Sequence, residues 1–175
     1  MPSGRAYADY MNRLNRILGT MLGAEIDFIV KGIDSTTHSA VASRREAMLR
    51  KRQTFYLGKD VSGNPYIYPG RLVEARVIAV AEKVLRVEAF GIECAIFARD
   101  LSWQWVSDVR DLYSVGDRVL VRVQEISGED AEHLSIRADI RSTFSETSVD
   151  NLKKCQVQSK YAGKVTDLRG GVVYI

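Results

Sequence analysis

The side chains best suited to catalysis are few in this chain. The two histidines, His38 and His133, each lie in or beside a polar turn, and neither has a recognisable spacing from a nucleophile or from metal ligands. Cys94 and Cys155 do not form a metal-ligand spacing and are too few for a disulfide framework. The pair Gly170-Gly171 lies between two expected strands rather than before a helix, so it is not a phosphate loop. The sequence therefore predicts a protein that is not an enzyme, with no catalytic residue, metal, cofactor or small-molecule substrate.

Positive charge offers a different chemistry, because it can attract phosphate. Residues 1–70 carry 10 Lys and Arg against 6 Asp and Glu, residues 71–141 carry 10 against 13, and residues 142–175 carry 5 against 3. The densest basic run, Arg44–Arg52, predicts a linker helix whose side chains either face solvent or follow a chain of phosphates, and both interpretations stay open. Attraction to phosphate would thus come mainly from the flanks.

Targeting and membrane signals are missing from the sequence. The N-terminus lacks the basic-then-apolar pattern of a secretory signal, and no apolar stretch is long enough to cross a bilayer. We therefore expect a cytoplasmic protein without a membrane partner.

Internal repetition is the strongest organising feature. Residues 23–35 (GAEIDFIVKGIDS) and 116–128 (GDRVLVRVQEISG) both begin with glycine, alternate apolar and polar residues and end in a polar turn. Residues 73–80 similarly correspond to residues 161–168. Alternation with a period of two, bounded by glycine and a turn, is typical of paired, half-buried strands. The chain thus looks like part of a tandem array.

The array divides into five segments. Residues 1–44 predict the closing half of a first repeat with an N-terminal helix, and residues 45–70 a basic linker. Residues 71–141 form a complete repeat, residues 142–160 a second linker, and residues 161–175 the start of a third repeat.

The complete repeat predicts a mainly β fold. Its expected strands are Leu72–Val80, Val84–Ala89, Glu93–Ala98, Val119–Ile126 and Leu134–Ile140, with a short helical or turn segment at Ser102–Tyr113. Five short strands with one insertion describe a five-stranded OB-type barrel, and an open sandwich is the alternative. We expect Trp103 and Trp105 to close the bottom of the barrel beside Val106 and Val109. An additional stacking surface is the other interpretation of these two tryptophans.

This unit resembles the RNA-binding repeats named after ribosomal protein S-one. Residues 84–101 (VLRVEAFGIECAIFARDL) are similar to the family's second and third strands, GAFVDLPGVEGLVHISEL, with Gly91, Glu93 and Leu101 identical. Gly116–Val121 (GDRVLV) resembles the Gly-Asp-x-Val-x-Val that precedes the family's fourth strand. Residues 163–175 look like the opening of another such repeat.

The resemblance implies that single-stranded RNA crosses the second and third strands, with bases stacked on aromatic rings and phosphates on basic side chains. Family positions fall on Lys83 just before the second strand, on Arg86 in the second strand and on Phe97 in the third. Two more fall on His133, at the opening of the fifth strand, and on Tyr174 in the third repeat. The full candidate set is Arg76, Lys83, Arg86, Phe97, His133, Arg137 and Tyr174. We expect Arg86 to be exposed between Leu85 and Val87. Because Phe97 lies in a strand that is apolar on both faces, alternation does not decide whether its side chain faces the core or the RNA.

The function that follows is single-stranded RNA binding by tandem repeats, in translation or RNA handling, with the small ribosomal subunit as a candidate partner. Two alternatives remain open. The repeats could be protein-docking or spacer modules, which the acidic balance of residues 71–141 favours, or the RNA-targeting part of a larger nuclease. A positive, uncovered face around Lys83, Arg86 and Phe97 would favour RNA over docking.

Overall fold

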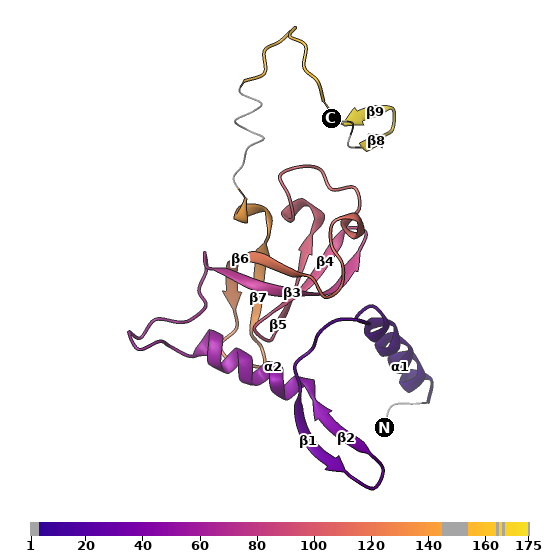
Figure 1. The fold of residues 1–175 in the computed structure, drawn as a ribbon, viewed down its shortest axis with the longest axis vertical. Coiled ribbons are helices and arrows are strands. Elements are labelled where there is room, and N and C mark those ends of the chain that lie inside the picture. Colours follow the sequence, from indigo (N-terminus) through magenta and orange to yellow (C-terminus); the bar gives the residue numbers. More distant parts are fainter. Residues whose placement is uncertain (1–3, 145–153, 164, 166, 175) are drawn as a thin grey trace.

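The chain folds around one central five-stranded sheet, shown in Figure 1. The computed structural model describes residues 4–144, 154–163, 165 and 167–174. Before the sheet come the helix α1, the hairpin β1–β2 and the helix α2, and after it comes the hairpin β8–β9. Their bounds are Gly4–Gly19 for α1, Ile29–Asp34 for β1, Ser39–Ser43 for β2, Arg44–Arg52 for α2, Asp167–Arg169 for β8 and Val172–Tyr174 for β9. No helix of the described residues is long and apolar enough to cross a membrane.

The central sheet is the predicted OB-type barrel. All of its strand pairs are antiparallel and follow the order β5-β4-β3-β6-β7. The two outer strands, β5 and β7, also contact one another, so the sheet curls almost into a closed barrel. The strands are β3 (Leu72–Ala81), β4 (Val84–Ala89), β5 (Ile92–Phe97), β6 (Arg118–Ser127) and β7 (Ser135–Asp139). The mainly β, OB-type fold is therefore confirmed.

Alternation along each strand builds the core. In β5, Ile92, Cys94 and Ile96 are buried, whereas the residues between them point outward. Val77, Leu85, Val87, Val121 and Val123 are fully buried in the neighbouring strands. Burying side chains of this size stabilises a fold by roughly 1.5–3 kcal/mol each. The core thus arises from the same period of two that the sequence displays.

The insertion between β5 and β6 closes one end of the barrel. It contains short 3-10 turns at Ala98–Asp100 and Val109–Asp111 rather than a longer helix. Val106 and Val109 are buried there, and the backbone N–H of Val109 donates to the carbonyl oxygen of Glu82 at 2.9 Å.

The helix α2 closes the opposite end. The side chain of Ser43 caps it by accepting from the backbone N–H of Glu46 at 3.2 Å. The Arg52 guanidinium donates to the carbonyl oxygens of Gly91, at 2.6 Å, and Ala131, at 3.1 Å. After α2, the π-helical turn Gln53–Leu57 places Tyr56 in the core, where its hydroxyl donates to the carbonyl oxygen of Ala89 at 2.9 Å. The predicted helix exists, but it packs on the barrel instead of extending freely through solvent.

The approach of α2 depends on one glycine. Gly91, in the turn between β4 and β5, has a φ of +87°, and a Cβ there would lie 2.4 Å from the carbonyl oxygen of Met48. Only glycine combines this backbone conformation with so close a helix. Gly63, in the loop before β3, has a similar φ of +84° but no atom within 4 Å of its would-be Cβ.

We therefore expect Gly91→Ala to destabilise the fold more than Gly63→Ala. Both substitutions place alanine in the left-handed region, at a cost of about 1–2 kcal/mol. Gly91→Ala must also displace α2, which adds about 1–3 kcal/mol as overpacking does elsewhere. Urea denaturation of both variants measures the difference. Equal losses of unfolding free energy would contradict the close packing of α2 on the β4–β5 turn.

Candidate nucleic-acid interface

Phe97, the last residue of β5, faces outward. Its side chain is 50% exposed, and it lies opposite Val84, the first residue of β4. The residue before it, Ile96, is buried, so the alternation of β5 settles a question that the apolar sequence left open. An exposed phenyl ring on a strand is available to stack against a ligand.

Two hollows meet at Phe97. The first, which we call the aromatic hollow, has a volume of about 510 Å³ and is lined by Lys83, Phe97, Arg99, Gln104, Trp105 and two smaller apolar residues. The second, the basic hollow, has a volume of about 320 Å³, and its lining includes Phe97, Arg99, Gln124, Arg137 and Arg141. Because Phe97 and Arg99 line both, the two hollows form one continuous surface.

Cations outnumber carboxylates around this surface. Lys83, Arg99, Arg137 and Arg141 line the hollows, against the carboxylates of Asp100 and Asp139. Ion pairs offset part of this excess, because Lys83 pairs with Glu82, Arg137 pairs with Glu125, and Asp100 pairs with both Arg99 and Arg141. The lining of the two hollows itself still contains more cations than carboxylates, which favours an anionic ligand here.

The arginines of the surface are held loosely enough to change partner. The guanidinium of Arg99 lies 5.6 Å from the centroid of the Phe97 ring, and its side chain is 81% exposed. Arg137 pairs with Glu125 at 3.2 Å, and its side chain is 75% exposed. Exposed ion pairs contribute only about 0–1 kcal/mol. A phosphate could therefore replace these contacts at little cost.

Lys83 lines the aromatic hollow, and Arg86 lies on the same outer face of the sheet as Phe97. The Lys83 ammonium donates to the carbonyl oxygen of Ser107 and lies 6.0 Å from the Trp105 ring centroid. Arg86 is exposed, as predicted, and lies opposite Ala95 in β5. Its guanidinium pairs with Glu93 at 3.1 Å, so it stands on the outer face with a carboxylate partner.

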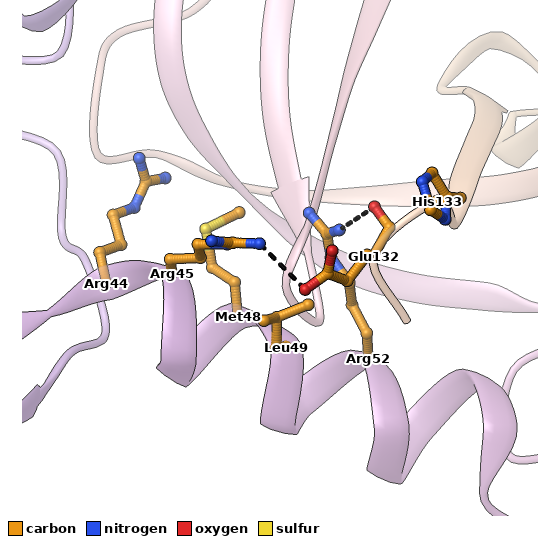
Figure 2. Close-up of a pocket in the computed structure, with 7 residues that line it drawn as sticks. All are labelled: Arg44, Arg45, Met48, Leu49, Arg52, Glu132 and His133. Atoms are coloured by element: carbon orange, nitrogen blue, oxygen red, sulfur yellow. Dashed lines mark hydrogen bonds and ion pairs between the residues drawn. The ribbon is translucent and has the colours of Figure 1, made fainter. Parts of the chain in front are cut away.

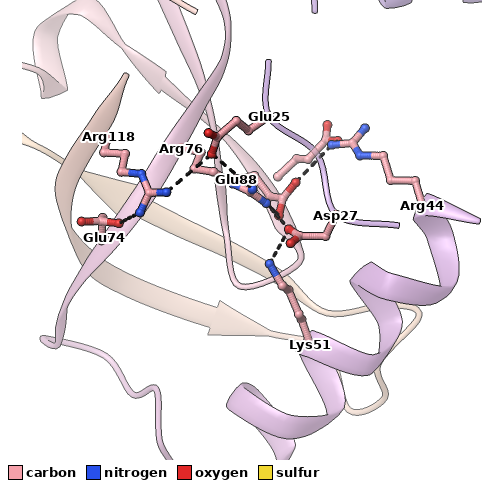
Figure 3. A network of polar contacts seen from close by, with 9 residues as sticks. Glu25, Asp27, Arg44, Lys51, Glu74, Arg76, Glu88 and Arg118 are labelled. Atoms are coloured by element: carbon pink, nitrogen blue, oxygen red, sulfur yellow. Dashed lines mark hydrogen bonds and ion pairs between the residues drawn. The ribbon is translucent and has the colours of Figure 1, made fainter. Parts of the chain in front are cut away.

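Arg76, a candidate RNA-binding residue, lies away from the surface around Phe97. Only 18% of its side chain is exposed, and it pairs with Glu88 at 3.1 Å and with Asp27 (Figure 3). Burial by itself lowers the pKa of Arg76, but the Asp27 hydrogen bond and Glu88 outweigh it and raise the pKa. Hydrogen bonds from Lys51 and Arg76 lower the pKa of Asp27 despite some burial. Arg76 therefore joins the segment before β1 to the barrel, and carboxylates already occupy its guanidinium.

His133 also lies away from Phe97. It lines a separate hollow against α2, with Arg45, Met48, Arg52 and Glu132 among its neighbours (Figure 2). Its Nδ1 lies 2.8 Å from a carboxylate oxygen of Asp130, and this hydrogen bond raises the pKa of His133.

Tyr174 belongs to a separate two-stranded sheet, where it pairs with Asp167. Its side chain lies outside the described part of the structure. The structure thus brings together Lys83, Arg86, Phe97 and Arg137, and leaves the other three candidates elsewhere.

The position of Trp105 differs from the prediction that it closes the bottom of the barrel. Its side chain is 50% exposed and lines the aromatic hollow, so it does not close the barrel; Val106 and Val109 do. Trp103 is partly buried beneath Arg141, whose guanidinium lies 4.6 Å from its ring centroid. Sequence reasoning also missed Arg99 and Arg141. Nothing local marked either residue, because the sequence left the face of Phe97 open and Arg99 lies in the 3-10 turn after β5.

One protein family matches the barrel. Residues 67–137, which include β3 to β6 and most of β7, match the S1 RNA binding domain family. One similar solved structure is described as the crystal structure of an a/eIF2alpha-aDim2p-rRNA complex from Pyrococcus horikoshii OT3. The similarity has 20% sequence identity and a TM-score of 0.40, and covers 51% of this chain and 53% of that chain. The match thus spans about half the length of that neighbour. Among the described residues, no group of three or more His, Cys, Asp and Glu side chains could hold a metal ion.

The placement of Arg76 predicts a loss of stability when it is removed. Arg76→Ala leaves Glu88, whose side chain is 2% exposed, paired with Arg44 at 3.2 Å but without its contact to Arg76. We expect the unfolding free energy to fall by about 1–3 kcal/mol, because a buried polar group loses a hydrogen-bond partner. Arg137→Ala is the control, with an expected change below about 0.5 kcal/mol for an exposed side chain. Chemical denaturation measures both, and a neutral Arg76→Ala would contradict the structural role.

Proposed function

We propose that the barrel binds single-stranded RNA across the surface around Phe97, without catalysing a reaction. The observation that carries this proposal is the half-exposed Phe97 ring, set between two hollows that are rimmed by cations. The match of residues 67–137 to the S1 RNA binding domain supports the same ligand.

The chemistry of the surface fits an unpaired strand better than a duplex. A base can stack on Phe97 only when it is free of its pairing partner, because stacked bases in a duplex do not present their faces. Arg99, Arg137 and Arg141 stand beside the ring, where the phosphates of a stacked nucleotide would pass. Stacking on an aromatic ring by itself tolerates any base, so a sequence preference has to come from hydrogen bonds to the base edge.

The biological setting is part of the proposal. We propose a cytoplasmic, ribosomal-protein-like role in translation or RNA handling, with the small ribosomal subunit as a candidate partner. Residues 1–44 and 161–175 would belong to neighbouring repeats of the same kind. Several weak sites on one chain would then bind one RNA more tightly than any single barrel, because each bound repeat raises the effective concentration of the next.

A protein-docking role is the second candidate. The ion pairs of Arg86 with Glu93 and of Arg137 with Glu125 favour it, since carboxylates already occupy these two arginines. Against it, the hollows around Phe97 stay open among the described residues and carry more cations than carboxylates. A role as the RNA-targeting part of a larger nuclease would use the same surface.

Fluorescence anisotropy with a labelled single-stranded RNA tests the proposal. We expect salt-sensitive binding, and Phe97→Ala should weaken it by about 1–3 kcal/mol because one base loses its stacking partner. The fold should survive, since half of the Phe97 side chain is already exposed. Arg137→Ala should reduce the slope of log affinity against log salt by about 0.7, the value for one phosphate contact of a single strand.

Tyr68→Ala is a matched control for Phe97→Ala. Tyr68 is 47% exposed, and the Arg71 guanidinium lies 5.7 Å from its ring centroid, much as Arg99 lies over Phe97. Tyr68 does not line either hollow around Phe97. If folded Phe97→Ala and Tyr68→Ala variants bind RNA equally well, the surface around Phe97 is not the binding site and the docking role replaces it.

A further inference from the structure

The aromatic hollow is built differently from the basic hollow. Two rings, Phe97 and Trp105, line it from separate parts of the chain: the end of β5 and the loop that follows the 3-10 turn Ala98–Asp100. Each of these side chains is 50% exposed. Ala98 and the buried Val106 complete an apolar lining. With about 510 Å³, the hollow falls in the size range of small-molecule sites.

Hydrogen-bonding groups stand around this apolar lining. Lys83, Arg99 and Gln104 each contribute a polar group that can donate. The Lys83 ammonium is positioned by its bond to the Ser107 carbonyl oxygen, and the Gln104 backbone N–H donates to the Ser102 hydroxyl at 3.0 Å. Apolar walls with donors at the edge fit a flat ring that carries acceptor atoms on its rim.

The arginines of the neighbouring basic hollow restrict which ligands fit the aromatic hollow. The aromatic hollow joins the basic hollow at Phe97 and Arg99, and Arg137 and Arg141 lie on the far side of that junction. A ligand that fills both must present a ring and, directly beside it, an anion. Every nucleotide within an RNA strand does so, whereas a peptide does so only where an acidic residue adjoins an aromatic one.

We infer that the aromatic hollow is a subsite for one unpaired nucleobase, which contacts both Phe97 and Trp105 while its adjoining phosphate lies at Arg99 and Arg137. This subsite rests on the proposed RNA binding and extends it beyond the strand face. The RNA turns at Phe97, from the outer face of β5 into the hollow next to the β5–β6 insertion. Base selection is expected here, because Lys83, Gln104 and Arg99 can hydrogen-bond to the base edge.

The two tryptophans of the chain provide the test. Trp103→Phe leaves Trp105 as the one tryptophan, and Trp105→Phe leaves Trp103, whose indole N–H donates to the carbonyl oxygen of Phe144 at 3.3 Å. Each protein is titrated with an unlabelled single-stranded RNA oligonucleotide, and its tryptophan fluorescence is recorded. We expect saturable quenching in the Trp103→Phe protein, with the same midpoint as the anisotropy titration, and little change in the Trp105→Phe protein.

Affinity gives the second readout. Trp105→Ala should weaken RNA binding by about 5- to 150-fold, the loss expected for one stacked base, whereas Trp105→Phe, which keeps a ring, should lose much less. An oligonucleotide with abasic positions throughout should bind the wild-type chain and the Trp105→Ala variant equally, because it retains phosphates but offers no base.

The outcomes separate the subsite from the proposed function. If RNA binds and Phe97→Ala weakens it, but Trp105 is not quenched and Trp105→Ala binds as the wild type does, the subsite is refuted and RNA binding stands. If none of the single-stranded RNA oligonucleotides, whatever their base composition, binds the folded wild-type chain at low salt, both proposals are refuted. Quenching of Trp105 together with the loss in Trp105→Ala supports both.

Discussion

A buried carboxylate organises the middle of this molecule. Glu88, in β4, is 3% exposed, and isolating a charge from water in this way costs several kcal/mol unless cations compensate for it. Arg44, from the start of α2, and Arg76, from β3, supply the two guanidinium groups, at 3.2 and 3.1 Å. The carboxylate therefore requires that α2 lie against the barrel, and that β3 and β4 stay in register.

The same charges continue along the outer face of the sheet. Arg44 also pairs with Glu93 at 2.8 Å, and Glu93 pairs in turn with the exposed Arg86 at 3.1 Å. On the other side, Arg76 reaches Asp27, which Lys51 of α2 also contacts (Figure 3). One network thus connects the segment before β1, the helix α2 and the outer face of β4. Its inner members stabilise the fold, and Arg86 lies at its exposed edge.

The two ends of the barrel differ in how they are covered. The β4–β5 turn at Gly91 lies beneath α2 and is filled by close packing. At the other end of the same two strands, Val84 pairs with Phe97, and the insertion buries Val106 and Val109 while leaving Trp105 half exposed. Because α2 closes the first end, the aromatic and basic groups of the second end can remain open to a ligand without exposing the core.

By itself, the sequence determined the local features of this protein. Alternation with a period of two and glycine turns predicted the five strands, and the position of Arg86 between Leu85 and Val87 predicted its exposure, because adjacent strand residues face opposite sides. Only the tertiary structure decided the face of Phe97, since β5 is apolar on both sides and the register with β4 was needed. Arg76 looked like a phosphate ligand until folding brought Asp27, 49 residues away in the chain, to its guanidinium. Arg141 likewise reaches Arg99 and Trp103 across about 40 residues, a contact that no local pattern encodes. Local periodicity determines which strand residues face the core and which face outward. Long-range packing determines which residues a charged group or an aromatic ring contacts.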